Sequence, residues 1–231
     1  MPDRPYVLLS AAVSVDGYID DATPDRLLLS DAADLDRVDE VRAGVDAILV
    51  GAGTIRADNP RLLVRSAARR AARAGRGQPP SPARVTLTSR GGLDPAARFF
   101  TARPAGAGGA GERLVYAAGP AAGRAGAELA GTGATVVAVG GGGLAEVLAD
   151  LAGRGVERLL VEGGSGVFTQ LLAGGLADEL QLMVAPFFVG GGVRLTGAGA
   201  YPHGPGRPMR LAQAAALGDA VLLRYLLQAP A

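Results

Sequence analysis

The sequence predicts an α/β fold with a mostly parallel central sheet and an antiparallel hairpin at its C-terminal end. Short apolar runs alternate with helical patterns from Tyr6 to Ala173, and this alternation is typical of a parallel sheet. From Asp178 onward the helical patterns stop and longer strand-like runs follow. Gly218-Asp219 separates the last two runs and predicts a tight hairpin turn. We expect a single domain over residues 1–231, since no repeat or strong break is visible.

The chain opens with a strand, a helix and a second strand. Tyr6–Val15 is apolar and partly β-branched, and it ends at the turn pair Asp16-Gly17, which predicts a buried strand. Ser30 is the expected N-cap of a helix that ends at Gly44. Ala47–Val50 is the second buried strand.

The middle and the end of the chain continue this pattern, with one exception. Further strands are expected at 84–88, 114–118, 135–139, 158–161, 179–189, 209–217 and 220–228, and helices at 120–130, 144–152 and 167–173. Residues 66–83 are rich in arginine and proline instead. We expect a flexible, solvated insert there, and a flap that grips phosphate is the alternative.

The composition excludes several kinds of site. No lysine is present, so a Walker-type phosphate loop and a lysine Schiff base are excluded. Without cysteine, and with His203 as the single histidine, we expect no metal site. The net charge of +1 predicts no nucleic-acid partner. No apolar run approaches the roughly 20 residues of a membrane span, and no signal peptide is recognisable, so we expect a cytoplasmic protein.

The stretch Asp46–Arg65 is the richest in chemical groups. It joins an apolar strand to the turn Gly51-Ala52-Gly53-Thr54, then brings Asp58, Arg61 and Arg65. The turn does not satisfy the dinucleotide fingerprint, because an arginine replaces the third glycine. Asp58 also suits a simple Asp-Asn-Pro turn, and the two arginines are either solvated or ligands of a phosphate. The residues alone leave these alternatives open.

A second glycine turn follows the strand at 158–161. Gly163–Gly166 opens a helix, and such a turn presents backbone N–H groups to a pyrophosphate. Glu162 just before it is either a cap for nearby amides or an acceptor for the paired N–H groups of an aminopyrimidine. Arg42 lies among apolar positions of its helix, where a guanidinium needs an anionic partner.

Blocks of the chain resemble the reductase domain family of riboflavin biosynthesis. The blocks are YVLLSAAVSVDGYI, DAILVGAGTIRADNPRLLVR, LLVEGGSGVFTQLL and GLADELQLMVAPFFVGGG, which occur in that order and span nearly the whole chain. The resemblance implies a three-layer fold like that of dihydrofolate reductase, NADPH as hydride donor and a homodimer. It also implies a phosphorylated ribosylaminopyrimidine as substrate, whose ribosyl group is reduced to ribityl. We expect a stand-alone form without the deaminase domain.

The resemblance also assigns roles to individual residues. Asp58 and Glu162 are the expected catalytic carboxylates, Asp58 mainly by orienting the cofactor and Glu162 by holding the pyrimidine. The expected cofactor-binding residues are Ala12, Thr54, Asp58, Ser89, Gly163, Gly164, Ser165, Gly166, Val167 and Phe168, within a cofactor turn that reaches Gln170. The expected substrate-binding residues are Arg42, Leu62, Arg65 and Glu162, with Arg65 on the 5′-phosphate.

The chain departs from the family pattern in the segment Arg26–Leu29. Family members often carry a serine and an aromatic residue there, whereas this chain has Arg26 and Leu28. Two alternatives follow. One is a related reductase acting on another pterin-like or pyrimidine-like substrate, such as weak dihydrofolate reduction. The other is a nucleotide-binding relative without catalysis. The choice between an aminated and a deaminated pyrimidine, and between NADPH and NADH, stays open.

Overall fold

The computed structural model of the chain describes residues 3–21, 23, 25, 27–104, 111–140 and 143–227. The chain divides into two compact units. The first unit comprises Met1–Pro5 and Asp39–Leu160, and the second comprises Tyr6–Val38 and Val161–Ala231. One of the three boundaries lies between Pro5 and Tyr6, and the other two fall inside helix α1 (Ala32–Ala43) and strand β7 (Arg158–Gly163). Because neither of the latter two boundaries coincides with a linker, a single domain over residues 1–231 stays a prediction.

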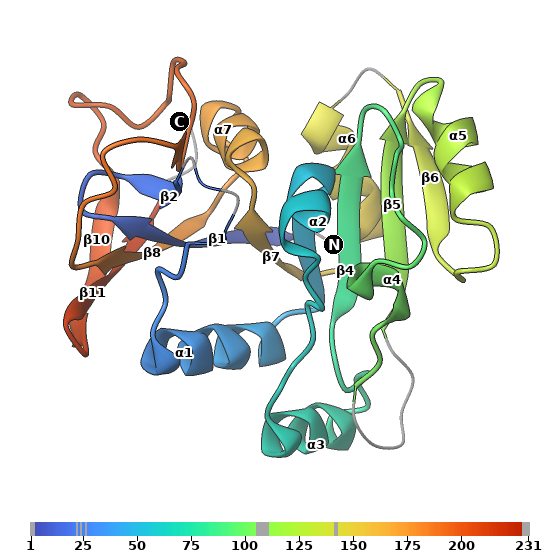
Figure 1. Cartoon of the computed structure of the whole chain (residues 1–231), viewed down its shortest axis with the longest axis horizontal. Helices are drawn as coiled ribbons and strands as arrows, with labels where there is room; N and C mark the ends of the chain where they lie inside the picture. The colour runs from blue at the N-terminus through green and yellow to red at the C-terminus, as the bar shows by residue number, and fades with distance from the viewer. Residues whose placement is uncertain are drawn as a thin grey trace. The chain divides into compact units, whose positions relative to one another are not determined.

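Parallel strands form the sheet of the first unit. Their order is β3 (Ala47–Gly51), β4 (Ala83–Thr88), β5 (Arg113–Ala118) and β6 (Thr135–Val139) (Figure 1). The helices that follow these strands are α2 (Ala52–Asp58), α3 (Ala67–Gly75), α4 (Arg98–Thr101), α5 (Ala121–Glu128) and α6 (Gly143–Gly153). The alternation of strands and helices in this unit agrees with the pattern in the sequence.

The core of the first unit explains why its strands were recognisable in the sequence. Ile48, Val85, Val115 and Tyr116 are fully buried. Strands of a parallel sheet are covered on both faces, so they appear as continuous apolar runs rather than as alternating patterns.

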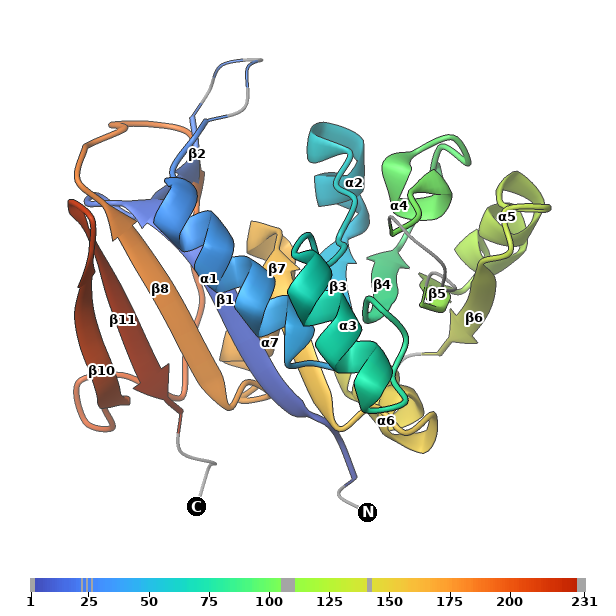
Figure 2. The same cartoon turned by 90° about the horizontal axis from the view of Figure 1, so that it is seen from below.

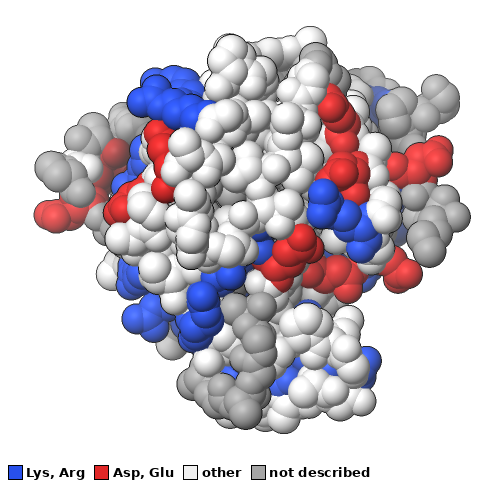
Figure 3. Space-filling model, turned by 90° about the vertical axis from the view of Figure 1, so that its right-hand side faces the viewer, with Lys and Arg blue, Asp and Glu red and all other residues white. Residues whose placement is uncertain are grey.

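In Figure 3, which faces the side of β6 and α5, charged side chains of both signs surround a wide uncharged area. The sequence TVVAV of β6 carries no charged residue.

The second unit contains the antiparallel part of the fold. Strand β1 (Tyr6–Ser14) runs parallel to β8 (Glu179–Ala185), whereas β11 (Ala220–Leu226) is antiparallel to β8, and β10 (Arg210–Leu217) to β11. The predicted hairpin turn between β10 and β11 is confirmed, with Gly218 at a φ of 60°. A small separate pair is formed by β2 (Tyr18–Asp20) and β9 (Val193–Arg194). The second-unit part of α1 and helix α7 (Ser165–Ala173) cover opposite faces of β1 and β8 (Figures 1 and 2).

The predicted strands and helices outside residues 51–83 are largely confirmed, except that the strand expected at 179–189 ends at Ala185. Six of them agree with the structure within two residues at each end: the strands at 84–88, 114–118 and 135–139, and the helices at 120–130, 144–152 and 167–173. The strand expected at 158–161 continues to Gly163. The helix predicted to follow Ser30 begins at Ala32, and the side chain of Asp31 caps it by accepting the N–H of Asp34. The predicted N-cap, Ser30, was therefore wrong by one residue.

The insert at 66–83 differs most from expectation. A flexible loop was predicted, but Ala67–Gly75 forms helix α3, whose N-cap Ser66 accepts the N–H of Arg69. Alanine and arginine are good helix formers, and the cap outweighs the prolines that follow. Arg73 is 2% exposed and donates to the backbone oxygens of Ala43, Val45 and Pro79. These bonds attach the insert to the rest of the first unit.

Candidate active site

The glycine turn after β3 is the first turn of a helix. We expected an irregular turn at Gly51–Thr54, but α2 runs from Ala52 to Asp58. Asn59 ends it in the left-handed conformation, at a φ of 44°, and its N–H donates to Ile55. Thr54 and Asp58 are four residues apart and both half-buried, so they share one face of the helix. The structure thus places two predicted cofactor residues side by side.

The exit of β4 lies beside the exit of β3. Gly51 pairs with Leu87 in the parallel register. The hydroxyl of Thr88, which is buried, accepts the N–H groups of Arg90 and Gly91 and fixes the turn. Ser89 is exposed on this turn. The first unit therefore presents Ser89 and the start of α2 at the same carboxyl edge of its sheet, where open α/β sheets bind ligands.

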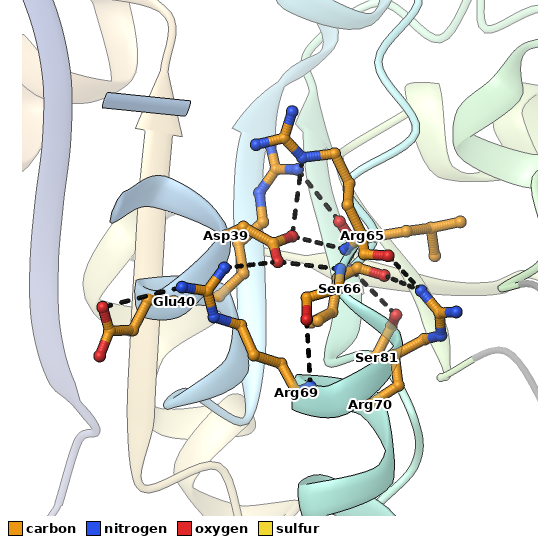
Figure 4. Close-up of polar contacts among 10 residues, drawn as sticks. Asp39, Glu40, Arg65, Ser66, Arg69, Arg70 and Ser81 are labelled. Atoms are coloured by element: carbon orange, nitrogen blue, oxygen red, sulfur yellow. Dashed lines mark hydrogen bonds and ion pairs between the residues drawn. The ribbon is translucent and has the colours of Figure 1, made fainter. Parts of the chain in front are cut away.

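The segment after α2 is irregular, yet several of its backbone groups are hydrogen-bonded to side chains. Arg42 donates to the oxygen of Leu63 at 3.2 Å, and the N–H of Val64 donates to the hydroxyl of Ser81 at 3.0 Å. Arg70 donates to the oxygens of Val64 and Arg65 (Figure 4). Buried backbone groups need such partners when no sheet or helix supplies them. The bonds hold the chain around Arg65 in one conformation.

Asp39 supplies the remaining partners of this segment. Its carboxylate accepts the backbone N–H groups of Arg65 and Ser66 and forms an ion pair with Arg69 at 3.1 Å (Figure 4). The side chain of Asp39 is only 2% exposed. Burial raises the pKa of Asp39, but the N–H donors and Arg69 outweigh it and hold that pKa below its ordinary value. Sequence reasoning missed this carboxylate, because its partners lie 26 or more residues away.

Arg65 remains accessible although its backbone is fixed. Its side chain is 53% exposed, and its Nε lies 3.7 Å from the carboxylate of Asp39. Leu62 is 2% exposed and has a φ of 50°, so it presents little surface to a ligand. Of the predicted substrate residues, the structure brings Arg42, Leu62 and Arg65 together around one segment. Their roles stay predictions.

The predicted residues of the second unit surround the start of α7. Glu162 is half-buried near the end of β7, and Gly164 is the N-cap of α7. The peptide bond between Gly163 and Gly164 is cis. The N–H groups of Val167 and Phe168 donate to Gly164, and both side chains are buried. The accessible part of this turn is therefore the backbone around Ser165 and Gly166.

Ala12 lies in the parallel part of the second unit. It is half-buried on β1, opposite Met183 of β8. The segment Arg26–Leu29 belongs to the same unit, but Arg26 lies outside the described residues. Leu28 is 77% exposed, which is unusual for a large apolar side chain.

A family model described as the RibD C-terminal domain matches residues 5–223. The chain belongs to the RibD C-terminal domain family. Among its relatives in this family, the 2,5-diamino-6-ribosylamino-4(3H)-pyrimidinone 5′-phosphate reductase of Archaeoglobus fulgidus is 38% identical over 189 residues. The alignment covers 81% of this chain and 83% of that protein. The resemblance stated from the sequence blocks is thereby confirmed.

Solved structures confirm the fold of this RibD C-terminal domain. The RibD of Acinetobacter baumannii is 24% identical with a TM-score of 0.79, and the match covers 98% of this chain and 59% of that one. This chain therefore spans about three fifths of that RibD. The dihydrofolate reductase of Enterococcus faecalis, complexed with NADP(H), is 14% identical with a TM-score of 0.50 over 96% of this chain and 95% of that one. Both likenesses concern the fold.

A further arginine cluster in this RibD C-terminal domain lies away from the predicted site residues. Arg84 at the start of β4 is fully buried, and its Nε and Nη2 atoms have no hydrogen-bond partner among the described residues. Burial, then the charges of Arg113 and Arg103, lower the pKa of Arg84 to about 10. A pocket of about 410 Å³ nearby is lined by Phe100, Arg103 and other residues, none of them a predicted site residue.

Two features are absent from the residues that the structure describes. Over 3–104, 111–140 and 143–227, apart from 22, 24 and 26, no three acidic, histidine or cysteine side chains are grouped as metal ligands. Within the same ranges, no helix has the length and apolarity that crossing a bilayer requires.

Proposed function

We propose that this chain is an NADPH-dependent reductase that converts the ribosyl group of 2,5-diamino-6-ribosylamino-4(3H)-pyrimidinone 5′-phosphate, or of its deaminated form, into a ribityl group. The observation that carries the proposal is the 38% identity, over 81% of the chain, with a protein named as a reductase of that compound. The exposed guanidinium of Arg65 on its bonded segment supports it, because arginine is well suited to bind a phosphate.

The substrate would be held by groups at its two ends. Arg65, with Arg42 close to the same segment, would bind the 5′-phosphate. Glu162 would accept the paired N–H groups of the pyrimidine, a geometry that a carboxylate can satisfy in bidentate fashion. These contacts would orient the substrate for the reaction. The protein contributes chiefly by this positioning, since the hydride comes from the cofactor.

The residues at the carboxyl edges of the strands fit a nicotinamide dinucleotide. A Cβ placed on Gly166 would meet no atom within 4 Å, so the first turn of α7 faces open space and can receive a pyrophosphate. Ser89 and Arg90 are both exposed and suit a 2′-phosphate, which favours NADPH over NADH. Thr54, Asp58 and the backbone of Ala12 would orient the remainder. The bound cofactor supplies the hydride.

The chemistry requires a hydride and a proton. The sugar ring opens to an imine at C1′, hydride adds to that carbon, and a proton adds to the attached nitrogen. Asp58 would mainly orient the cofactor, with proton delivery as its secondary role. Glu162 would keep the pyrimidine in place throughout. We also propose that the chain acts as a homodimer, which the family resemblance implies and sedimentation velocity tests.

A related reductase with another pterin-like or pyrimidine-like substrate is the second candidate. The observation that favours it is the changed segment Arg26–Leu29 with its exposed Leu28. Spectrophotometric NADPH consumption would be compared for the ribosylaminopyrimidine phosphate, for dihydrofolate and without substrate. We expect rapid consumption with the first alone. Turnover of dihydrofolate alone would favour the second candidate. No substrate-dependent consumption would favour a relative that only binds nucleotides.

A further inference from the structure

The carboxylate of Asp39 has an unusual set of partners for a buried acid. One oxygen accepts the N–H of Arg65, and the other accepts the N–H of Ser66 at 3.0 Å. The second oxygen also accepts Nη1 of Arg69 at 3.1 Å. Two consecutive N–H groups of an irregular segment are thus bonded to a single side chain on α1 (Figure 4). Asp39 thereby fixes the backbone of Arg65 on both sides of its carbonyl group.

The guanidinium of Arg65 is influenced by the same carboxylate. Its Nε lies 3.7 Å from Oδ1 of Asp39, which is an ion-pair distance but longer than a hydrogen bond. Arg69 lies closer, at 3.1 Å, so Asp39 has ion-pair partners in both arginines. The side chain of Arg65 is 53% exposed, whereas that of Arg69 is 23% exposed. Of the two arginines that pair with Asp39, Arg65 is thus the more exposed one.

We propose that Asp39 is a positioning residue for recognition of the substrate's 5′-phosphate: it holds the backbone and the guanidinium of Arg65 in the geometry that binds the phosphate. The inference rests on the proposed function, since it gives Arg65 the phosphate. Asp39 itself does not touch the substrate. Preorganisation of a binding residue by a buried neighbour contributes through geometry, and small displacements weaken binding strongly.

The chain offers a matched control on the same helix. Asp34 is 1% exposed and forms an ion pair with Arg37 at 2.7 Å, so it is as buried and as well paired as Asp39. Its carboxylate accepts hydrogen bonds from Ser30 and Arg37, neither of which belongs to the 62–66 segment. Asp39→Asn and Asp34→Asn therefore remove comparable buried charges. Only the first alters the support of Arg65.

The test compares steady-state kinetics of the full chain with the phosphorylated substrate and with its dephosphorylated form. For Asp39→Asn we expect KM for the phosphorylated substrate to rise about tenfold, the loss of roughly one charge-assisted hydrogen bond. The kcat should stay within about twofold, and the dephosphorylated substrate should be unaffected. Asp34→Asn should leave KM and kcat unchanged for both substrates. Asp39→Glu, which keeps the charge but moves it, should also raise KM and serves if Asp39→Asn does not fold.

Several outcomes overturn the inference. Equal losses with both substrates, or a loss in kcat alone, would make Asp39 a general structural residue. If the ratio of the KM values for the two substrates is the same in Asp39→Asn as in the wild type, Asp39 has no role in phosphate recognition. In an Arg65→Ala background, Asp39→Asn should raise KM for the phosphorylated substrate little further. If the effects of the two substitutions on KM are fully additive, the inference is contradicted as well.

The wild-type assay separates this inference from the proposed function. If the wild-type chain turns over the phosphorylated substrate, only the variants decide the role of Asp39. If it does not, calorimetric titration with ribose 5-phosphate takes the place of kinetics. The wild type should then bind it about tenfold more tightly than Asp39→Asn, by the same estimate. Equal affinities, or no binding to the wild type, would overturn the inference.

Discussion

Arg73 donates a hydrogen bond of 2.7 Å to the backbone oxygen of Val45, just before the start of β3. The same guanidinium donates to Ala43 at 3.1 Å and to Pro79 at 2.8 Å. It therefore joins the end of α1, the entry to β3 and the residues after α3. Each acceptor is a carbonyl that would otherwise need water or another donor.

Arg73→Ala should lower the free energy of unfolding by about 3 kcal/mol, because hydrogen bonds to a charged group are lost and buried carbonyls lose their donors. Urea unfolding followed by circular dichroism measures the change. Arg76→Ala is the control. Arg76 is exposed and its contact with Ala43 is 3.3 Å long, so its loss should cost less than about 0.5 kcal/mol. Similar costs for both variants would contradict the structural role of Arg73.

Arg84 is expected to reduce stability. Among the described residues, two of its nitrogen atoms are buried without a hydrogen-bond partner. Its contacts there with the oxygen of Arg98, at 3.4 Å, and with the ring of Phe99 offset this in part. Arg84→Met keeps much of the volume and removes the charge, so the free energy of unfolding should rise by about 1 kcal/mol. A loss of stability on urea unfolding would indicate that the guanidinium is satisfied by ordered water.

The pH dependence of the wild type gives an independent check on Arg84. Its folded pKa is about 10, well below the ordinary value of an arginine. Between these two pH values the unfolded chain holds a proton that the folded chain has released. Stability therefore rises with pH across this window, and the contribution is absent in Arg84→Met. Comparing the two unfolding curves at pH 9.5 and 11 tests the sign.

The sequence predicted the strands well, because buried parallel strands are continuous apolar runs ending at glycine. Helix α2 was missed because Gly51 and Gly53 suggest a turn and the helix is only seven residues long. Helix α3 was missed although its signals were present, namely Ser66 as N-cap and a run of alanine and arginine. The prolines that follow it favour a loop, and they led to the prediction of a flexible insert.

The candidate site was predicted in part. A family resemblance supplied Arg42, Thr54, Asp58 and Arg65, whose types and positions are visible in the sequence. Asp39 could not be found in that way. Its role depends on accepting backbone N–H groups 26 and 27 residues away, and a backbone N–H has no sequence signature. Long-range side chain to backbone bonds become visible only in three dimensions.

Asp39 should also stabilise the fold in a pH-dependent manner. Its folded pKa is depressed, so its contribution is complete above the ordinary pKa of an aspartate, about 4, and is lost as the pH falls through the folded pKa. The difference in unfolding free energy between the wild type and Asp39→Asn should be constant from pH 6 to 8 and shrink below pH 4. A difference that persists unchanged at pH 2.5 would mean that packing, and not charge, causes it.

Arg65→Ala should raise KM for the phosphorylated substrate by at least about tenfold, since an arginine–phosphate contact is a charge-assisted bond. Steady-state kinetics with NADPH consumption as the readout measure it. Arg61→Ala removes another exposed arginine from the same stretch and should change KM by less than about twofold. An unchanged KM in Arg65→Ala would show that the phosphate binds elsewhere.

Asp58→Asn distinguishes orientation from proton transfer in the proposed reaction. Asp58 ends α2 on the same helix face as Thr54, which suits a residue that orients the cofactor. The asparagine keeps the size and one acceptor oxygen but cannot deliver a proton. We expect a weaker affinity for NADPH with a single-turnover rate of hydride transfer within about threefold of the wild type. General acid catalysis contributes about 10²- to 10⁴-fold, so a loss of about a hundredfold would assign the proton to Asp58 instead. Stopped-flow absorbance at saturating NADPH separates the two cases, because saturation removes the binding defect and leaves the chemical step.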